Sequence, residues 1–443
     1  MEDNTVIGEM LRDRVIEVVR EPGSLSEMEQ NLRRVLVWLG GVVLHLWLMW
    51  LEKPYAESTV KCRCGGEARY LYQREGVLRT VFGVVKYRRA YYTCPQCGRG
   101  TYPLDEQLGL RPNAMSAEVE RLAGMVGVEH PFEQGSRLFE ALTLVGLSDH
   151  SLDKAAQAYG QEQTKREAEW EAEAYDMDRL LERKRTVNPP RRLYGTIDGG
   201  RVHIRGMGVQ DALWRELKVG AWFVTRAQPP SKPGDTWSIR AEQVSYYTDI
   251  CDAETFGRLV WSTGVQQHAQ LAPELIILGD GARWIWDLVA EHFPHAIQIV
   301  DWFHACQYLA PVAEAAFTDP PQRDAWLKHT QTALWEGRLD DVIAACQQHI
   351  QSTRPDDPAQ KAVTYFSNNR QRMDYPTYRA NGYHIGSGTI ESGIKQIGAQ
   401  RMKVAGAIWN LDSARQVAKA RAAYLSGQWN VLAARRTHLA RAA

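Results

Sequence analysis

The chain has 443 residues, of which 44% are hydrophobic and 24% are charged. This length exceeds that of a common single domain, so we expect two to four domains, and the composition excludes both wholesale disorder and a small disulfide-stapled module. The chain contains 53 basic residues (Lys and Arg) and 53 acidic residues (Asp and Glu), but these charges are unevenly distributed along it. Residues 61–92 hold eight Lys/Arg against two acids, and residues 392–443 hold nine against one, so both regions could meet a polyanion.

The N-terminal residues 1–58 are predicted to be a helical region. Residues 35–51 form an apolar run that falls short of the roughly 20 residues that a membrane-spanning helix needs. The run also contains His45 and two glycines, which favours a buried helix over a membrane span. No short apolar segment with a cleavage site opens the chain, so a signal peptide is not supported. We therefore expect a cytoplasmic protein without a membrane partner.

Four of the seven cysteines form two close pairs in the strand-like region 59–110. Cys62 and Cys64 are separated from Cys94 and Cys97 by 29 residues of alternating apolar and polar sequence. Four thiolates on two turns make a tetrahedral site, so we predict a zinc-ribbon-like β module with a structural Zn²⁺ ion. The first pair has one intervening residue where two are commoner, and a disulfide or an incidental pairing is the alternative.

Basic and aromatic residues alternate within this β module. Lys86, Arg88 and Arg89 are interleaved with nearby tyrosines. Such a surface is typical of a DNA-reading module, whereas aromatic residues on strands more often belong to a core. We predict that the three cations contact DNA.

Helical spacing returns in residues 111–187. Residues 138–159 show the pattern of a helix, a short turn and a second helix, which predicts a helix-turn-helix-like region. Helical hairpins that bind nothing share this pattern and are the alternative. Residues 161–185 carry eight acids and six bases and are expected to be a solvated connector helix. The Asn188-Pro189-Pro190 break then marks a domain boundary.

Strand-like runs begin after this break. Three strands in a meander, followed by alternating helix and strand, predict a mixed sheet with helices on both faces. The fold class is therefore multidomain α+β and α/β, with residues 188–310 and 380–429 as two parts of one core. We predict a helical insertion over residues 311–379 and a basic tail over residues 430–443.

Three acids in this core are candidates for a metal site. Asp198 and Asp280 each precede a glycine near the end of a predicted strand, where open α/β sheets bind ligands, and Glu391 follows a glycine-rich turn at the start of a helix. Carboxylates that converge need a countercharge, which divalent cations supply. A hairpin turn at Asp198 and helix capping by the other two are the alternatives. We assign Asp249 to solvent or to capping.

Four stretches carry a family resemblance: YGTIDGGRVHIR, ELIILGDGARWIWDL, AIQIVDWFHACQYL and GYHIGSGTIESGIKQIGAQRMKVAGAIWN. They resemble bacterial insertion-sequence DDE transposases of the ISKra type, which are relatives of the Mutator-like transposases. The resemblance implies an RNase H-like catalytic core in which Asp198, Asp280 and Glu391 form the DDE triad and bind two Mg²⁺ ions, with Mn²⁺ as a substitute. It also implies that Asp301 and His304 form an acid-x-x-His signature at the active site, although the two residues could simply form a helix cap.

Basic residues follow the third acid. Lys395, Arg401 and Lys403 come on the same or an adjacent helix as Glu391, and acids are almost absent from this run. A solvated basic face is the alternative, but such a face normally mixes charges of both signs. We predict that these cations hold phosphates beside the scissile one.

These features together predict a DDE-type DNA transposase, bacterial and nucleoid-associated. It would hydrolyse a phosphodiester at the ends of its element and transfer the strand to target DNA, both by in-line displacement between two metal ions. Its partners would be double-stranded DNA, namely the terminal inverted repeats and the target, and a homodimer or larger synaptic assembly. The alternatives are a catalytically inactive, domesticated DNA-binding regulator and an RNase H-like structure-selective nuclease.

Overall fold

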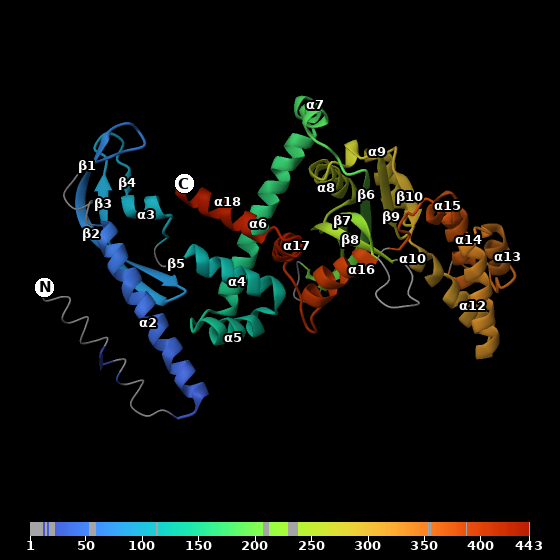
Figure 1. Cartoon of the computed structure of the whole chain (residues 1–443), viewed down its shortest axis with the longest axis horizontal. Helices are drawn as coiled ribbons and strands as arrows, with labels where there is room; N and C mark the ends of the chain where they lie inside the picture. Colours follow the sequence, from blue (N-terminus) through green and yellow to red (C-terminus); the bar gives the residue numbers. More distant parts are fainter. Residues whose placement is uncertain are drawn as a thin grey trace. The chain divides into compact units, whose positions relative to one another are not determined.

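The computed structural model describes residues 23–52, 59–111, 114–206, 212–228, 238–352, 354, 356–386 and 388–442, together with residues 12, 13 and 16. The chain divides into two compact units (Figure 1). Unit 1 comprises Met1–Glu162 and Gln428–Ala443, and unit 2 comprises Gln163–Gly427. The division falls inside helix α6 (Asp149–Ala174), so one continuous helix contributes to both units.

Unit 1 combines a small sheet with helices. The sheet order is β1-β2-β3-β4 with antiparallel pairing, and β5 pairs with β2 in parallel. The predicted alternating strands are therefore present. The elements besides α6 are α2 (Leu25–Glu52), β1 (Thr59–Lys61), β2 (Glu67–Thr80), β3 (Gly83–Thr93), β4 (Gly100–Thr101), α3 (Pro103–Leu108), β5 (Ala114–Met115), α4 (Ala117–Glu129), α5 (Phe132–Thr143) and α18 (Trp429–Ala442).

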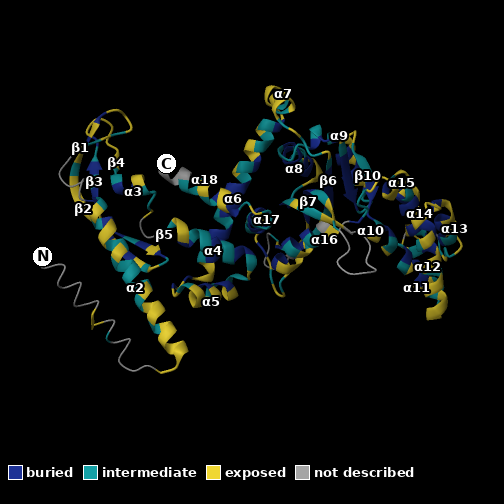
Figure 2. Cartoon of the chain, viewed as in Figure 1, coloured by how far each residue is buried: buried dark blue, intermediate teal, exposed yellow. Residues whose placement is uncertain are grey.

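Helix α2 is exposed or half-buried along most of its length, as its yellow and teal colouring in Figure 2 shows. Leu48 and Glu52 are its buried residues, whereas Leu36, Trp47 and Trp50 keep 55%, 60% and 63% of their surface. The prediction of a buried helix over residues 35–51 is therefore wrong for most of its length. Among the described helices, α2 alone is long and apolar enough to span a membrane, a test that core helices of soluble proteins also pass.

The predicted solvated connector is partly buried. Glu162, Gln163 and Glu167 on α6 are buried. Glu162 accepts a hydrogen bond from Arg435 of α18 within unit 1, at 2.9 Å, so the predicted basic tail is a packed helix. Charged residues on a helix predicted a solvated face, but ion pairing with partners distant in sequence allowed these acids to be buried.

Unit 2 is built on one mixed sheet with the order β10-β9-β6-β7-β8. β6, β7 and β8 form the predicted antiparallel meander, and β9 and β10 extend it in parallel. From α6 to the end of α10, the described elements of this unit are α7 (Met177–Thr186), β6 (Arg192–Arg205), β7 (Ala212–Gln228), β8 (Ser238–Asp249), α8 (Ala253–Gln266), η2 (Ala269–Leu271), β9 (Glu274–Gly279), α9 (Arg283–His292), β10 (Ile297–Val300) and α10 (Trp302–Gln307).

Every regular element among the described residues of 311–379 is helical, as predicted. The helices that begin between residues 309 and 379 are α11 (Leu309–Ala316), α12 (Pro320–Trp335), α13 (Leu339–Gln347), α14 (Pro358–Asn368), η3 (Arg370–Arg372) and α15 (Tyr375–Ala380). The chain then returns to the sheet with α16 (Gly388–Gly393), the π-helix η4 (Ile394–Met402) and α17 (Leu411–Leu425).

Helices cover both faces of the sheet. Successive side chains of a strand point to opposite faces, so Leu217 and Trp222, five positions apart on β7, face opposite layers. Trp222 packs against α8, where a Cβ at Gly264 would lie 2.9 Å from its ring. Leu217 faces η4, where a Cβ at Gly398 would lie 3.8 Å from its side chain. The sheet is thus buried on both sides, which explains the continuous apolar run of β9.

Candidate functional sites: a cysteine cluster and strand-end carboxylates

The four paired cysteines gather at one point of unit 1. The Sγ atoms of Cys62 and Cys97 are 3.6 Å apart, as are those of Cys64 and Cys94, and all four lie within 4.8 Å of one another. Zinc–sulfur bonds of about 2.3 Å in a tetrahedron place sulfur atoms about 3.8 Å apart, so the cluster is compatible with a structural zinc site. Within the described residues, no other three Cys, His, Asp or Glu side chains bring their ligand atoms this close.

Backbone hydrogen bonds shape the turns that present these thiols. The N–H of Gly65 donates to the carbonyl of Cys62 at 3.0 Å, and the N–H of Gly98 donates to the carbonyl of Cys94 at 2.8 Å. The backbone N–H of Cys97 also donates to the Cys94 thiol and is the main cause that lowers the pKa of Cys94 to about 7. A lower thiol pKa favours the thiolate, which is the form that binds metal.

Three acids in unit 2 directly follow hydrogen-bonded positions on adjacent parallel strands. Ile197 of β6 pairs with Gly279 of β9, which pairs with Val300 of β10. The next residues on the three strands are Asp198, Asp280 and Asp301. Because neighbouring strands lie about 4.8 Å apart, the three acids lie side by side where β9 and β10 end.

Asp198 faces the layer that contains α16. β6 runs unbroken through Asp198, which pairs with Val219 of β7, so the hairpin-turn alternative is wrong. Asp198 and Gly200 share one face of the strand, and a Cβ at Gly200 would lie 3.6 Å from Ile394. Glu391 lies one helical turn before Ile394, in the helix that contacts β6 and β7. The side chain of Glu391 lies outside the described residues.

The electrostatics of Asp198 reflect this neighbourhood. Burial is the largest cause that raises the pKa of Asp198, to about 6, and the negative charges of Asp280 and Asp301 raise it further. The N–H of Gly199, which donates to its carboxylate at 2.6 Å, and the nearby His304 act in the opposite direction. The negative charges of Asp280 and Asp301 therefore disfavour ionisation of Asp198. A cation bound among the three acids would reduce this repulsion.

Two of the acids also accept hydrogen bonds from backbone N–H groups: Asp301 caps α10, as the capping alternative predicted, whereas Asp280 does not cap α9, whose N-cap position is Ala282. Asp280 accepts from the N–H of Ala282 at 2.8 Å, and Asp301 accepts from the N–H of His304 at 2.6 Å at the start of α10. Each carboxylate has a second oxygen, so capping and a role at the carboxylate cluster are compatible. Asp301 is almost fully buried, at 1% exposure.

Two neighbours of the acids were not singled out from the sequence. The charge of Asp301 acts on His384, whose pKa is lowered by burial, and the backbone N–H of His384 donates to the Tyr194 hydroxyl at 3.0 Å. Tyr365 of α14 donates its hydroxyl proton to the carbonyl of Asp280 at 2.8 Å. His384 lies within the GYHIGSG stretch of the resemblance, which was a usable signal. Nothing near Tyr365 in sequence indicated its position.

The predicted DNA contacts divide into exposed and buried residues. Lys86, Arg88, Lys395 and Lys403 are exposed. Arg89 is 6% exposed and forms an ion pair with Asp105, so the prediction that it lies on a DNA-facing surface is wrong.

Arg401 requires the same correction, because it is 1% exposed and its guanidinium lies 5.0 Å from the ring centre of Trp409. Both arginines lie in runs of positive charge that favoured a basic surface. The fold uses their long side chains in packing instead.

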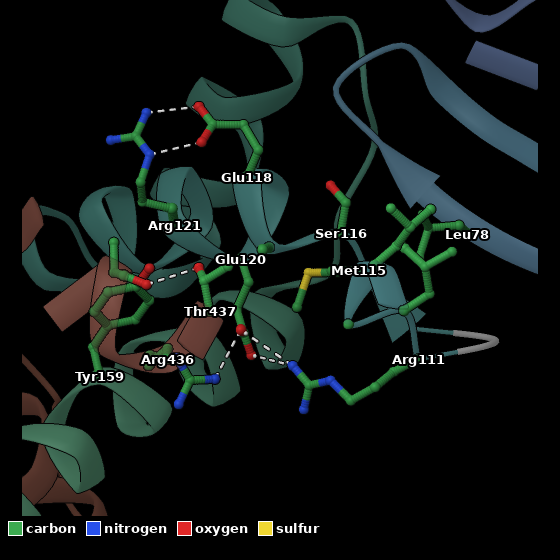
Figure 3. Close-up of a pocket in the computed structure, with 15 residues that line it drawn as sticks. Leu78, Arg111, Met115, Ser116, Glu118, Glu120, Arg121, Tyr159, Arg436 and Thr437 are labelled. Atoms are coloured by element: carbon green, nitrogen blue, oxygen red, sulfur yellow. Dashed lines mark hydrogen bonds and ion pairs between the residues drawn. The ribbon is translucent and has the colours of Figure 1, made fainter. Parts of the chain in front are cut away.

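A cavity of about 250 Å³ in unit 1 offers no comparable acid cluster (Figure 3). Its arginines are held by its own acids: Arg121 pairs with Glu118 at 2.7 Å, while Arg436 and Arg111 pair with Glu120 at 2.7 and 3.3 Å. Each of these arginines therefore already has a carboxylate partner, so no described cation of this cavity is left unpaired for an ionic ligand.

No protein-family model matches the chain, and no curated protein matches it.

Proposed function

We propose that the chain is an insertion-sequence DNA transposase with an RNase H-like core and a DDE carboxylate triad. The observation that carries the proposal is the adjacency of Asp198 and Asp280, which follow paired positions on neighbouring parallel strands. The mixed sheet supports an RNase H-like core, since a three-strand meander is followed by alternating helix and strand. The location of Glu391, in a helix that contacts β6, supports its role as the third acid.

The donor set fits hard divalent cations. Asp198, Asp280 and Glu391 would hold Mg²⁺ through carboxylate oxygens, and the pKa of Asp198 is raised first by burial and then by the charges of Asp280 and Asp301, which a bound cation would offset. Bound Mg²⁺ would supply charge neutralisation and activation of the attacking hydroxyl during phosphodiester displacement. Asp301 and His304 would orient this end of the sheet through the cap of α10.

The other predicted partners belong to the same proposal. Zn²⁺ held by the four cysteines would stabilise a zinc-ribbon-like module whose exposed Lys86 and Arg88 meet the phosphates of the element ends. The helices α5 and α6, separated by residues 144–148, would add a helix-turn-helix-like contact with DNA. Because two ends must be joined, the active form would be a dimer or a larger assembly.

The test is cleavage and strand transfer on duplexes taken from the DNA that flanks the coding sequence. With Mg²⁺, we expect Asp198→Asn, Asp280→Asn and Glu391→Gln each to lose about 10³-fold in rate, corresponding to about 4 kcal/mol in barrier height. Asp324→Asn, which removes an exposed acid from α12, is the matched control and should keep wild-type activity.

Each outcome of this assay has a defined meaning. Equal activity in the wild type and all three acid variants would end the proposal of a DDE enzyme. Cleavage without end joining would favour the structure-selective nuclease. Binding of the flanking duplexes without any cleavage by the wild type would favour the DNA-binding regulator.

The zinc site has its own test. Metal analysis of the purified chain should give one zinc ion per chain, and Cys94→Ser should lose it together with hydrogen-exchange protection of β2 and β3. The expected loss is large because structural zinc supplies on the order of 10 kcal/mol to folding. Cys251→Ser, which alters a half-buried thiol outside the cluster, should retain the metal. A metal-free wild type with protected strands would contradict a structural zinc ion.

A further inference from the structure

A cleft of about 920 Å³ opens beside the loop that follows Asp280. One wall is α9, which begins directly after this loop, and the other is α14 of the helical region. Gly281 has φ +97°, and a Cβ there would come within 2.5 Å of the Tyr365 ring. Only glycine therefore lets α14 pack this closely against the Asp280 loop.

Hydrogen bonds hold the two walls to the same loop. Tyr365 donates to the carbonyl of Asp280 at 2.8 Å, and the side-chain amide of Asn369 donates to the carbonyl of Gly281 at 3.3 Å. The indole N–H of Trp286 on α9 donates to the Asn369 side-chain oxygen at 3.0 Å. A molecule in the cleft would therefore lie beside the loop that follows Asp280.

The cleft carries an excess of positive charge. Arg283, Lys361 and Arg372 line it together with one acid, Asp287. The acid lies 3.5 Å from Arg283, whose side chain is 93% exposed. Neither Lys361 nor Arg372 forms an ion pair with any described residue, and Arg372 donates instead to the neutral Gln298 at 2.6 Å. Unlike the cavity of unit 1, this cleft has cations left for an anionic ligand.

The remaining lining suits bases as well as phosphates. The amides of Gln360 and Asn368 can both donate and accept hydrogen bonds. Tyr308 is half-buried and stacks on Tyr365, with ring centres 3.7 Å apart and planes at 11°. Cations, amides and an aromatic platform in one concave site are the combination that binds single-stranded nucleic acid.

We infer that this cleft binds an unpaired stretch of the DNA strand that leads to the phosphodiester at the carboxylate cluster. The inference rests on the proposed function, because it assigns the cleft to the substrate of those acids. Stacking on Tyr308 requires an unpaired base, so the duplex next to the reacting phosphate would have to be opened. The helical region 311–379 would thus act as the second wall of a strand-binding site.

The test is fluorescence anisotropy with the full chain and a labelled single-stranded oligothymidylate, without divalent ions. Lys361→Gln should weaken binding about 5-fold, and Arg283→Gln combined with Lys361→Gln about 20-fold, with a shallower dependence on salt because fewer phosphates are neutralised. Lys328→Gln removes an exposed cation from α12 outside the cleft and should bind as the wild type does. Circular dichroism of each variant checks that it is folded.

Two comparisons separate this inference from the proposed function. Asp198→Asn should lose cleavage but keep binding of the single strand. If the double variant binds the single strand as tightly as the wild type does, the cleft assignment is overturned, whether or not cleavage depends on Asp198. Cleavage that is independent of Asp198, with binding lost in the double variant, overturns the proposed function and leaves the cleft as a single-strand site. Equal losses for single-stranded and duplex DNA overturn the assignment to an unpaired strand.

Discussion

Two acids on the same sheet of unit 2 differ in how their charge is balanced. Asp249, at the end of β8, is 5% exposed and receives two hydrogen bonds from Arg415, at 2.7 and 3.1 Å. The buried Lys419 lies 3.0 Å from the same carboxylate and also pairs with Glu167. The prediction that Asp249 belongs to solvent or capping is therefore wrong. Asp198, on β6, has other acids as its neighbours instead.

The two pKa values move in opposite directions for this reason. Burial alone would raise the pKa of Asp249, but Arg415 and Lys419 outweigh it and hold the pKa below its ordinary value. At Asp198 burial is not outweighed, and the pKa rises to about 6. An acid to which the fold supplies cations, as at Asp249, stabilises the structure. An acid left among acids is a candidate for binding a cation from solution.

The largest effect is expected where the built-in cation is removed. Lys419→Met should lower the free energy of unfolding of unit 2 by about 3–5 kcal/mol, because Asp249 and Glu167 would lose a buried countercharge. Chemical denaturation of the full chain measures this loss. Lys328→Met, which alters an exposed lysine on α12, is the control. A change of less than about 0.5 kcal/mol in Lys419→Met, typical of a surface substitution, would contradict the structural role assigned to this network.

A cation from solution should compensate at the other acid. Mg²⁺ at about 100 times its dissociation constant should stabilise the wild type by about 2.7 kcal/mol, because it binds the folded carboxylates. The stabilisation should be absent from the variant that combines Asp198→Asn with Asp280→Asn. Thermal unfolding with and without Mg²⁺ measures both. Equal stabilisation of the variant would show that Mg²⁺ acts elsewhere on the chain.

Neutralising each acid should have opposite effects without added metal. Asp198→Asn should raise the stability of unit 2 by about 2–3 kcal/mol above pH 6, since the pKa of Asp198 rises from 3.8 to about 6 and each pKa unit corresponds to about 1.4 kcal/mol. Asp249→Asn serves as the contrasting variant and should lower the stability, because Arg415 and Lys419 would lose their partner. Two changes of the same sign would refute the distinction between the acids.

The smallest effect is on pH dependence. The folded protein binds the Asp198 proton more tightly than the unfolded chain does, so ionisation costs stability between about pH 4 and pH 6. The wild type should lose stability relative to Asp198→Asn across this window as pH rises, and the difference should level off above pH 6. The contribution of Asp249 has the opposite sign and is lost only as pH falls below its ordinary pKa, near 3.9. Thermal midpoints of the wild type, Asp198→Asn and Asp249→Asn, measured from below pH 4 to above pH 6, test whether the two contributions have opposite signs.

Prediction from the sequence succeeded where the signal was local. Alternation in residues 59–105 predicted the antiparallel strands, and two cysteine pairs predicted the thiol cluster that the structure contains. Apolar runs that end in acids predicted Asp280 at the end of β9, whereas Asp198, also predicted at a strand end, lies in the middle of β6. The resemblance, rather than any spacing, indicated Glu391, and its side chain lies outside the described residues.

Prediction failed where burial depended on partners distant in the sequence. The charged stretch 161–185 indicated a solvated helix, yet Glu162 and Glu167 are buried through pairing with residues more than 250 positions away. Arg89 and Arg401 indicated a basic surface, and both are buried. The apolar run 35–51 indicated a buried helix, but much of its surface is exposed. In each case the composition of the stretch was read correctly. Whether the stretch is buried depends on which distant part of the chain packs against it, and composition does not show that.

The sequence by itself determined which residues can form strands, helices and thiol turns, because periodicity and turn chemistry act over a few neighbouring positions. Tertiary structure alone decided which acids are neutralised by the fold and which are not. Strand register aligned Asp198, Asp280 and Asp301, and packing of α17 delivered cations to Asp249. The physical reason is that electrostatic energy depends on distance and burial in space, and neither follows from separation along the chain.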